Sequence, residues 1–357
     1  MIDLELENAR NKIDKIDQEI VKLLNERAGV CKGLGSLKAG EKAEVFDPRR
    51  ERSVLENVSS QAAEAPTESV RAVYREIMSM CRNIQSPTRV AFLGPEGSFS
   101  DEAARTTFGK SSQYISCRRI KNVFSEVDNM NADLGVAPFE NSLEGSINET
   151  LDSLLSHNLS IIGEIQLRIH QNLIVDPQLE SLSQIERLYS HPQALAQCDG
   201  YITQYLSAAE LVTTESTARA TEHVLRDRRG AAIGSKVAAE LNGLKILASN
   251  IEDSPNNYTR FVVLKRGTPP DKGEKTSLIF FVENVPSALS SILNEFAKMS
   301  INITMILSRP ADLRPWEYFF FLDFEGSTSD ERCATTLKSL KEKTRLLRIL
   351  GSYSRLQ

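Results

Sequence analysis

A repeat of apolar residues in the N-terminal stretch constrains the fold more than any other feature of the sequence. The apolar residues recur at alternating three- and four-residue steps, which places them on one face of a helix; they are Leu6, Ala9, Ile13, Ile16, Ile20 and Leu23, continued by Val30, Leu34 and Leu37. A helix from Leu4 to Ala39 would be roughly 50 Å long at 1.5 Å per residue. So long a helix needs a partner for its apolar face, most simply a second copy. We therefore predict a homodimer or a higher homo-oligomer.

Two linkers, Ser86-Pro87-Thr88 and Gly267 to Gly273, divide the rest of the chain. A chain of 357 residues is too long for a single compact core. We predict three domains, at residues 1–86, 88–267 and 275–357. The first is all-helical, because Asp47-Pro48 is a good cap and first turn for a second helix and residues 67–83 read as a third.

The central and C-terminal segments mix strands with helices. Apolar runs at residues 90–93, 134–137, 161–162, 172–175, 231–233 and 260–264 read as strands separated by helical stretches, including one at residues 147–155. This alternation predicts an α/β domain of two lobes. Residues 275–357 follow the order strand, helix, strand, strand, helix, strand, with strands expected at 277–282, 303–307, 318–324 and 348–353 and helices at 288–299 and 330–343. That order is typical of a ferredoxin-like α+β domain.

Composition excludes several function classes. A net charge of −5 lacks the basic footprint of a nucleic-acid-binding protein. Five scattered cysteines without a CxxC pair fit a reducing compartment and argue against a disulfide framework or a zinc site. The N-terminus has no apolar signal region, and no run approaches a membrane span. We expect a soluble cytoplasmic protein that uses neither a cofactor nor a metal and binds neither nucleic acid nor membrane.

A set of charged residues marks a candidate site in the helical segment. Arg27 falls on the apolar seam, where a charge is costly unless it is paired, so the alternative is an arginine satisfied by a structural carboxylate. Lys38 lies within roughly 20° of Arg27 around the helix. Arg10 is about 25 Å away along the axis, so it can share a pocket with Arg27 only in an antiparallel dimer. The set is completed by Asp47, Arg50, Glu51 and Gln85.

These residues resemble the helical chorismate mutase family. By that resemblance Arg10 of a partner chain and Arg27 hold the two carboxylates of chorismate, and Lys38 and Gln85 donate hydrogen bonds to the ether oxygen. The resemblance further implies that Glu51 and Asp47 orient the ring hydroxyl with support from Arg50. Cys81 stands where the best-known member has a serine. A unimolecular rearrangement suits such a site, because it needs a reactive conformer and positive charge at the breaking bond rather than a nucleophile.

Five polar motifs follow in the central segment and closely resemble prephenate dehydratase. They are Val90 to Ser100, Ala137 to Ser146, Tyr189 to Cys198, Glu215 to Ala218 and Asn257 to Phe261. The resemblance implies a bilobal fold like type II periplasmic binding proteins, with substrate in the cleft. It makes Thr259 the critical hydroxyl near the departing group. Substrate contacts are expected from Glu140, Asn141, Ser142, Ser190, His191, Gln193, Gln197, Glu215, Ser216, Thr217 and Arg260.

Some of these residues have alternative roles. Arg260 faces a substrate carboxylate or forms a salt bridge within its lobe. His191 is either an acid with a near-neutral pKa or, with Pro192, the turn before a helix, which is the favoured interpretation. Helix N-termini at Ser98, Ser146 and Ser216 can supply anion sites.

The C-terminal segment resembles the amino-acid-binding ACT domain, which in this family senses phenylalanine. The effector residues implied are Ser287, Ala288, Leu289, Leu307, Ser308 and Arg309. Ser287 replaces a usual Gly, and Leu307 replaces a usual Glu, so effector binding or its coupling is expected to be altered. The stretches Trp316-Glu317-Tyr318 and Phe324-Glu325-Gly326 follow the family pattern.

The combined interpretation is a bifunctional chorismate mutase–prephenate dehydratase regulated by L-phenylalanine. One rival is a ligand-sensing transcription regulator, but residues 1–86 show neither a helix-turn-helix nor a basic excess. A second rival keeps the dehydratase and treats the helical segment as a dimerisation module with a decayed site. The near-complete polar set of that segment argues against it.

Overall fold

The computed structural model describes residues 2–41, 44–310 and 318–356, which form two compact units. The first unit contains residues up to Thr88 together with Thr107–Gln113, and the second contains Arg89–Thr106 and the chain from Tyr114 onward. Trp316 and Glu317 of the C-terminal motif lie outside the described residues.

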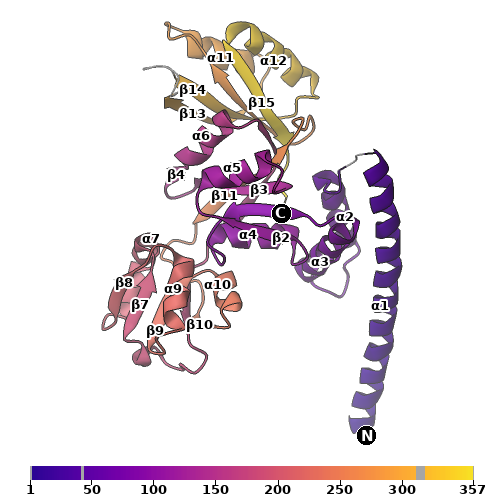
Figure 1. Cartoon of the computed structure of the whole chain (residues 1–357), viewed down its shortest axis with the longest axis vertical. Helices are drawn as coiled ribbons and strands as arrows, with labels where there is room; N and C mark the ends of the chain where they lie inside the picture. Colours follow the sequence, from indigo (N-terminus) through magenta and orange to yellow (C-terminus); the bar gives the residue numbers. More distant parts are fainter. Residues whose placement is uncertain (1, 42–43, 311–317, 357) are drawn as a thin grey trace. The chain divides into compact units, whose positions relative to one another are not determined.

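The first unit is helical, as predicted (Figure 1). It consists of α1 (Ile2–Glu41), α2 (Pro48–Ser60) and α3 (Thr67–Gln85). Asp47 caps α2 by accepting hydrogen bonds from the backbone N–H groups of Arg49 and Arg50, and Pro48 occupies the first turn, where its missing N–H costs nothing.

Most of the apolar face of α1 is exposed within this unit. Ile13, Ile16 and Leu23 are 56%, 59% and 55% exposed. The buried contacts of the unit lie instead around α3, where Met78 and Cys81 are buried and Phe46 packs edge-on against Phe108 at 5.3 Å between ring centroids. The segment Thr107–Gln113 is therefore part of the core of the helical unit, although it follows the first strand of the central domain in sequence.

The first lobe of the second unit is built on a sheet with the strand order β2-β1-β3-β11-β5, and β4 pairs with β3. The strands are β1 (Arg89–Leu93), β2 (Gln113–Cys117), β3 (Leu134–Asn141), β4 (Gly145–Ser146), β5 (Leu159–Arg168) and β11 (Tyr258–Arg266), with helices α4 (Phe99–Phe108), α5 (Ile120–Asp128) and α6 (Asn148–Ser156). β1 runs parallel to β3, whereas β11 is antiparallel to both β3 and β5. The apolar run of β3 is buried over its first six residues, as expected of a central strand.

The second lobe is inserted between β5 and β11. Its sheet has the order β10-β6-β9-β7-β8. The strands are β6 (Asn172–Val175), β7 (Arg187–Ser190), β8 (Glu210–Thr213), β9 (Gly230–Gly234) and β10 (Lys245–Ala248), with the short helix η1 (Leu182–Gln184) and helices α7 (Pro192–Gln197), α8 (Asp199–Tyr205), α9 (Thr217–Val224) and α10 (Lys236–Leu241). The two-lobed α/β fold is confirmed.

The C-terminal part forms a four-stranded antiparallel sheet of order β13-β14-β12-β15 (Figure 1). Its elements are β12 (Lys275–Phe281), α11 (Ala288–Lys298), β13 (Ile303–Pro310), β14 (Tyr318–Glu325), α12 (Glu331–Lys343) and β15 (Leu346–Tyr353). The expected ferredoxin-like order is confirmed. One face of this sheet shares a hydrophobic core with the first lobe, in which Phe139 meets Phe321 at 4.9 Å between ring centroids.

Five strands were not predicted: β2, β4, β7, β8 and β10. They are short or half-exposed, so their apolar residues form no run long enough to be recognised. In the described ranges, no helix is both long and apolar enough to cross a membrane.

Candidate active sites

Arg27 lies against α3 in the helical unit. Its guanidinium donates to the Sγ atom of Cys81. Among the described residues, no carboxylate pairs with Arg27, so the alternative of a structural carboxylate partner finds no support there. Cys81 is buried, and both burial and a hydrogen bond with Cys31 raise the pKa of its thiol. The predicted pair of Arg27 and Cys81 is therefore brought together by the packing of α1 on α3.

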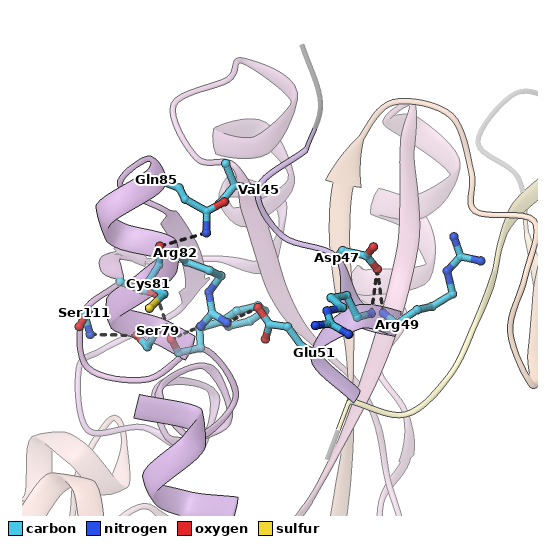
Figure 2. A network of polar contacts seen from close by, with 12 residues as sticks. Val45, Asp47, Arg49, Glu51, Ser79, Cys81, Arg82, Gln85 and Ser111 are labelled. Atoms are coloured by element: carbon cyan, nitrogen blue, oxygen red, sulfur yellow. Dashed lines mark hydrogen bonds and ion pairs between the residues drawn. The ribbon is translucent and has the colours of Figure 1, made fainter. Parts of the chain in front are cut away.

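Glu51 is held by a residue that the sequence did not single out (Figure 2). Arg82 donates to Glu51 and to the backbone carbonyl of Phe108, and its guanidinium lies 5.6 Å from the ring centroid of Phe46. Burial raises the pKa of Glu51, an effect that Arg82 opposes. Arg50, expected to support Glu51, is exposed instead, and Arg82 has that role. The sequence held one indication of this role, because Arg82 directly follows Cys81 on the face of α3 that is buried.

The remaining predicted residues of this site come from α1, from the cap of α2 and from the end of α3. Lys38 donates to the carbonyl of Val45 at 3.2 Å. Gln85 donates from Nε2 to the carbonyl of Cys81 at 3.1 Å, and its buried Oε1 has no hydrogen-bond partner among the described residues. Asp47 is occupied as the cap of α2 (Figure 2). Arg10 is exposed on α1.

A cavity of about 270 Å³ lies in the two-lobed domain. Most of the predicted residues line it, and they come from both lobes: Asn141, His191, Gln193, Gln197, Glu215, Ser216, Thr217 and Thr259. The lining also includes five residues outside the predicted site, Phe99, Ile169, Gln171, Ala194 and Asn257. Asn257 lay inside a recognised motif, whereas Gln171 follows His170 in a stretch without any motif.

A chain of amide hydrogen bonds fixes the Thr259 hydroxyl in this cavity. The Oδ1 atom of Asn141 accepts from the backbone N–H groups of Leu143 and Glu144, so its Nδ2 is the donor, reaching Thr259 Oγ1 at 3.0 Å and Asn257 Oδ1 at 2.9 Å. Because Thr259 Oγ1 accepts this bond, its own proton is free to point toward a bound molecule.

The same chain of amides continues into the second lobe. Gln197 accepts at Oε1 from both Asn257 Nδ2 and Gln171 Nε2, each at 3.2 Å. Gln171 is almost wholly buried, and its Oε1 has no hydrogen-bond partner within the described residues. Asn257 and Gln171 therefore extend the positioning of Thr259 across both lobes.

Four predicted residues are not among the described residues that line the cavity: Glu140, Ser142, Ser190 and Arg260. Ser190 is buried and donates to the carbonyl of Ile233, so it ties β7 to β9. Ser142 bonds to the backbone of Asn256 and Tyr258. Glu140 lies on β3 in register with Arg260 and Ser146.

Arg260 forms the salt bridge within its lobe that the sequence left open as an alternative, and it has a second partner outside that lobe. It pairs with Glu164 of β5 and with Asp323 of β14, which belongs to the C-terminal sheet. His191 caps α7 through its Nδ1, as favoured, and also lines the cavity. Of the three expected helix starts, Ser98 directly precedes α4 and Ser216 caps α9, whereas Ser146 lies in β4, before α6.

A second cavity of about 670 Å³ shares Glu215 and Ser216 with the first. Three arginines line it, Arg118, Arg119 and Arg219, together with Gly94, Pro95, Ser116 and Cys117. The combined space is thus basic on one side, which favours an anionic molecule. No three His, Cys, Asp or Glu side chains are grouped to hold a metal ion in residues 2–41, 44–310 or 318–356.

The expected effector residues lie at the start of α11 and along β13. Ser287 has a φ of 67°, in the left-handed region that favours glycine, which explains why a glycine suits this position. Ala288 and Leu289 begin α11, and Leu307 and Ser308 are paired with β14. The Nη2 atom of Arg309 donates to both carboxylate oxygens of Asp152 on α6, to Oδ2 at 2.8 Å and to Oδ1 at 3.1 Å.

Comparisons with known proteins match three families in chain order. Chorismate mutase type II matches residues 9–86, prephenate dehydratase residues 90–269 and the ACT domain residues 276–342. The bifunctional chorismate mutase/prephenate dehydratase of Aquifex aeolicus is 42% identical over 355 residues, which is 98% of each chain.

Two solved structures superpose on three quarters of the chain. One is prephenate dehydratase from Arthrobacter aurescens in complex with L-Phe, with a TM-score of 0.69 and 34% identity over 75% of this chain and 90% of that one. The other is described as a quorum-quenching acylase, with a TM-score of 0.69 and 32% identity over 75% of this chain and 98% of its own.

Proposed function

Because the chain belongs to the family of bifunctional chorismate mutase/prephenate dehydratases, and so converts chorismate to prephenate and prephenate to phenylpyruvate, we propose an assignment of each step to its residues. The rearrangement belongs to the helical unit and the dehydration to the two-lobed cavity. The observation that carries the second assignment is the chain of amides that orients the Thr259 hydroxyl.

For the rearrangement, charge is supplied where the ether bond breaks. Arg27 binds one carboxylate of chorismate with Cys81 beside it, and Arg10 of a second copy binds the other. Lys38 and Gln85 donate to the ether oxygen, which becomes negative in the transition state. Glu51, held by Arg82, orients the ring hydroxyl together with Asp47. Because Arg50 is exposed, it makes no direct contact with Glu51 or with the substrate in this scheme.

For the dehydration, prephenate loses carbon dioxide and its ring hydroxyl, and the hydroxide must acquire a proton to leave as water. Thr259 donates a hydrogen bond to this oxygen, because its Oγ1 atom accepts from Asn141 and its own proton stays available. A threonine hydroxyl is too weak an acid to be the proton's source, so it orients the proton rather than supplying it. The basic side of the neighbouring cavity attracts the dianionic substrate, and Gln193, Ser216 and Thr217 offer it hydrogen bonds in the cavity that Glu215 also lines.

The C-terminal domain is proposed to bind L-phenylalanine. The support is the ACT match and the complex of the Arthrobacter aurescens enzyme with L-Phe. The residues proposed are those at the start of α11 and on β13, with Ser287 holding a backbone conformation that glycine would take without strain. Phenylpyruvate formation measured across a phenylalanine titration tests this, since a flat response would remove the effector role.

A second copy of the chain is proposed to cover α1. The support is the exposed apolar stripe, in which Leu4 and Leu37 are 65% and 69% exposed, and the need to bring Arg10 to Arg27. A cytoplasmic location fits five cysteines that are all free and buried. Sedimentation of the full chain tests the oligomer, and a monomer with full mutase activity would contradict it.

The experiment that tests the two-site assignment uses two variants of the full chain. Lys38→Ala should abolish conversion of chorismate while leaving dehydration of supplied prephenate at the parent rate. Thr259→Ala should do the reverse and lower kcat for dehydration by about 100-fold or more. The two reactions are followed by loss of chorismate absorbance and by phenylpyruvate formation. Loss of both activities in either variant, or full dehydration by Thr259→Ala, would overturn the assignment.

A further inference from the structure

A buried cluster of charges joins the strand that carries Thr259 to the C-terminal sheet. Its centre is Arg260, the residue directly after Thr259 on β11. Thr259 lines the catalytic cavity, whereas the Arg260 side chain is only 12% exposed and stacks over the Phe139 ring at 4.8 Å from guanidinium carbon to centroid. Two consecutive residues of one strand thus belong to two different environments.

The anionic partners of Arg260 come from both domains. Its Nε atom lies 2.8 Å from Glu164 Oε2 on β5, and its Nη2 atom lies 2.7 Å from Asp323 Oδ2 on β14. These two contacts lack the alignment of hydrogen bonds, so they act as charge pairs. A well-formed hydrogen bond runs from Arg260 Nη2 to the Tyr353 hydroxyl of β15 at 3.0 Å.

Strand β12 completes the cluster. Lys275 pairs with Glu164 at 2.8 Å, and the Ser277 hydroxyl bonds to both Asp323 and Tyr353. Two cations therefore balance two carboxylates. Burial alone would raise the pKa of Glu164, but Arg260 and Lys275 hold it below its ordinary value, so the carboxylate stays ionised.

Such a cluster permits little movement. Asp323 is wholly buried, and a buried carboxylate that loses its cation is left unpaired in a nonpolar environment, which strongly destabilises the fold. The C-terminal sheet and β11 can therefore move relative to each other only as far as the Arg260 side chain can follow while keeping its ion pairs. Arg260 thus connects that sheet directly to the strand position next to Thr259.

We propose that Arg260 is a positioning residue for dehydration, which fixes β11 to the C-terminal sheet so that the placement of Thr259 depends on how that sheet is seated. The inference rests on the proposed role of Thr259. It assigns to Asp323, Tyr353 and Ser277 an effect on a reaction whose cavity they do not line within the described residues.

The test uses Asp323→Asn in the full chain, with prephenate supplied and phenylalanine absent. This substitution keeps the shape of the side chain and removes one of the two negative charges that pair with Arg260, the one on the C-terminal sheet. We expect kcat for dehydration to fall by about tenfold or more, because small displacements of a reacting group are costly, while KM stays near the parent value. Conversion of chorismate by the helical unit serves as an internal control and should not change.

The matched control is Asp152→Asn. Asp152 on α6 also pairs with an arginine of the C-terminal sheet, Arg309, and among the described residues it forms no ion pair with β11. If the cluster merely holds the domains together, kcat of the folded protein should be unchanged in both variants, whatever each loses in stability. If Arg260 positions Thr259, only Asp323→Asn should lose kcat, at a temperature where both variants are folded by circular dichroism.

Tyr353→Phe provides a milder second variant. It removes one hydrogen bond of Arg260 and no charge, so it decides the question even if Asp323→Asn fails to fold. A smaller fall in kcat at constant KM supports the proposal. A rise in KM at constant kcat would make Arg260 a substrate ligand, and unchanged kinetics would also overturn the proposal. Thr259→Ala separates the two levels: if it is inactive while Asp323→Asn and Tyr353→Phe are unaffected, this inference fails and the proposed site stands.

Discussion

Thr259 and Glu51 are each held in place by a neighbouring side chain. Asn141 can orient the Thr259 hydroxyl because two backbone N–H groups fix its own amide. Arg82 plays the equivalent part for Glu51. Sequence motifs predicted a role for both Thr259 and Glu51 by their resemblance to known families. The supporting residue was missed for Glu51, because an arginine on a helix is ordinarily a solvated residue and only the packing shows that Arg82 is 3% exposed.

Glu102 of α4 gives a prediction about pH. Burial and the nearby Glu240 raise its pKa from 4.5 to about 7. Between these values the folded chain holds a proton that the unfolded chain releases, so this group makes stability fall as pH rises from about 4.5 through 7.

The substitution that tests this is Glu102→Gln, which cannot ionise. At pH 8 the variant should be more stable than the parent by on the order of 3 kcal/mol, and at pH 4 the two should be equal. The free energy of unfolding is measured by urea titration at each pH, with the loss of dehydratase activity as the signal for unfolding of the second unit. Parallel pH profiles for the parent and the variant would show that Glu102 titrates normally.

Elements differed in how well the sequence predicted them. The three helices of the first unit and the strands of the C-terminal sheet have long periodic patterns and were confirmed. Strands such as β7 and β8 have only four residues each, so they became visible only through their partners in the sheet. The salt bridge from Arg260 to Asp323 joins residues 63 positions apart, and no local pattern encodes such a contact.

The packing of α1 on α3 leads to a prediction at Gly35. A methyl group at this position would lie 2.9 Å from the Gln85 Cα atom, so Gly35→Ala must push the two helices apart. Alanine is favoured over glycine in a helix by about 1 kcal/mol. A loss of stability or activity in Gly35→Ala must therefore come from the clash with Gln85. We expect a fall in chorismate conversion of about tenfold or more, because Gln85 would be displaced.

Gly33→Ala is the matched control for Gly35. Gly33 is on the same helix, and a methyl group there would meet nothing within 4 Å. This variant should keep full mutase activity and gain thermal stability. Equal losses in the two variants would show that glycine is needed in α1 for a reason other than close approach.

At the scale of the whole molecule, the boundary between the two units does not follow the order of the sequence. Phe108 falls within the residues that match prephenate dehydratase, but its ring lies in the core of the helical unit against Phe46. Phe108→Ala should destabilise the helical unit by about 3–5 kcal/mol. We expect mutase activity to be lost on heating at a lower temperature, with a smaller change for the dehydratase.

Phe124→Ala is the corresponding substitution in the second unit. Phe124 is equally buried, and it packs in the core of the first lobe. Its replacement should lower the temperature at which dehydratase activity is lost and spare the mutase. If both variants lowered both temperatures together, the two units would unfold as one.

The segment Thr107–Gln113 has a consequence for how such a gene can be divided. A break in the coding sequence at Ser86-Pro87-Thr88 would look natural, since all three mutase helices precede it. The encoded fragment would nevertheless lack the Phe108 carbonyl that Arg82 binds and the Ser111 N–H that donates to Ser79. A lineage that separated the two enzymes by fission would therefore need compensating substitutions around Arg82, and these are the positions to compare in separately encoded mutases.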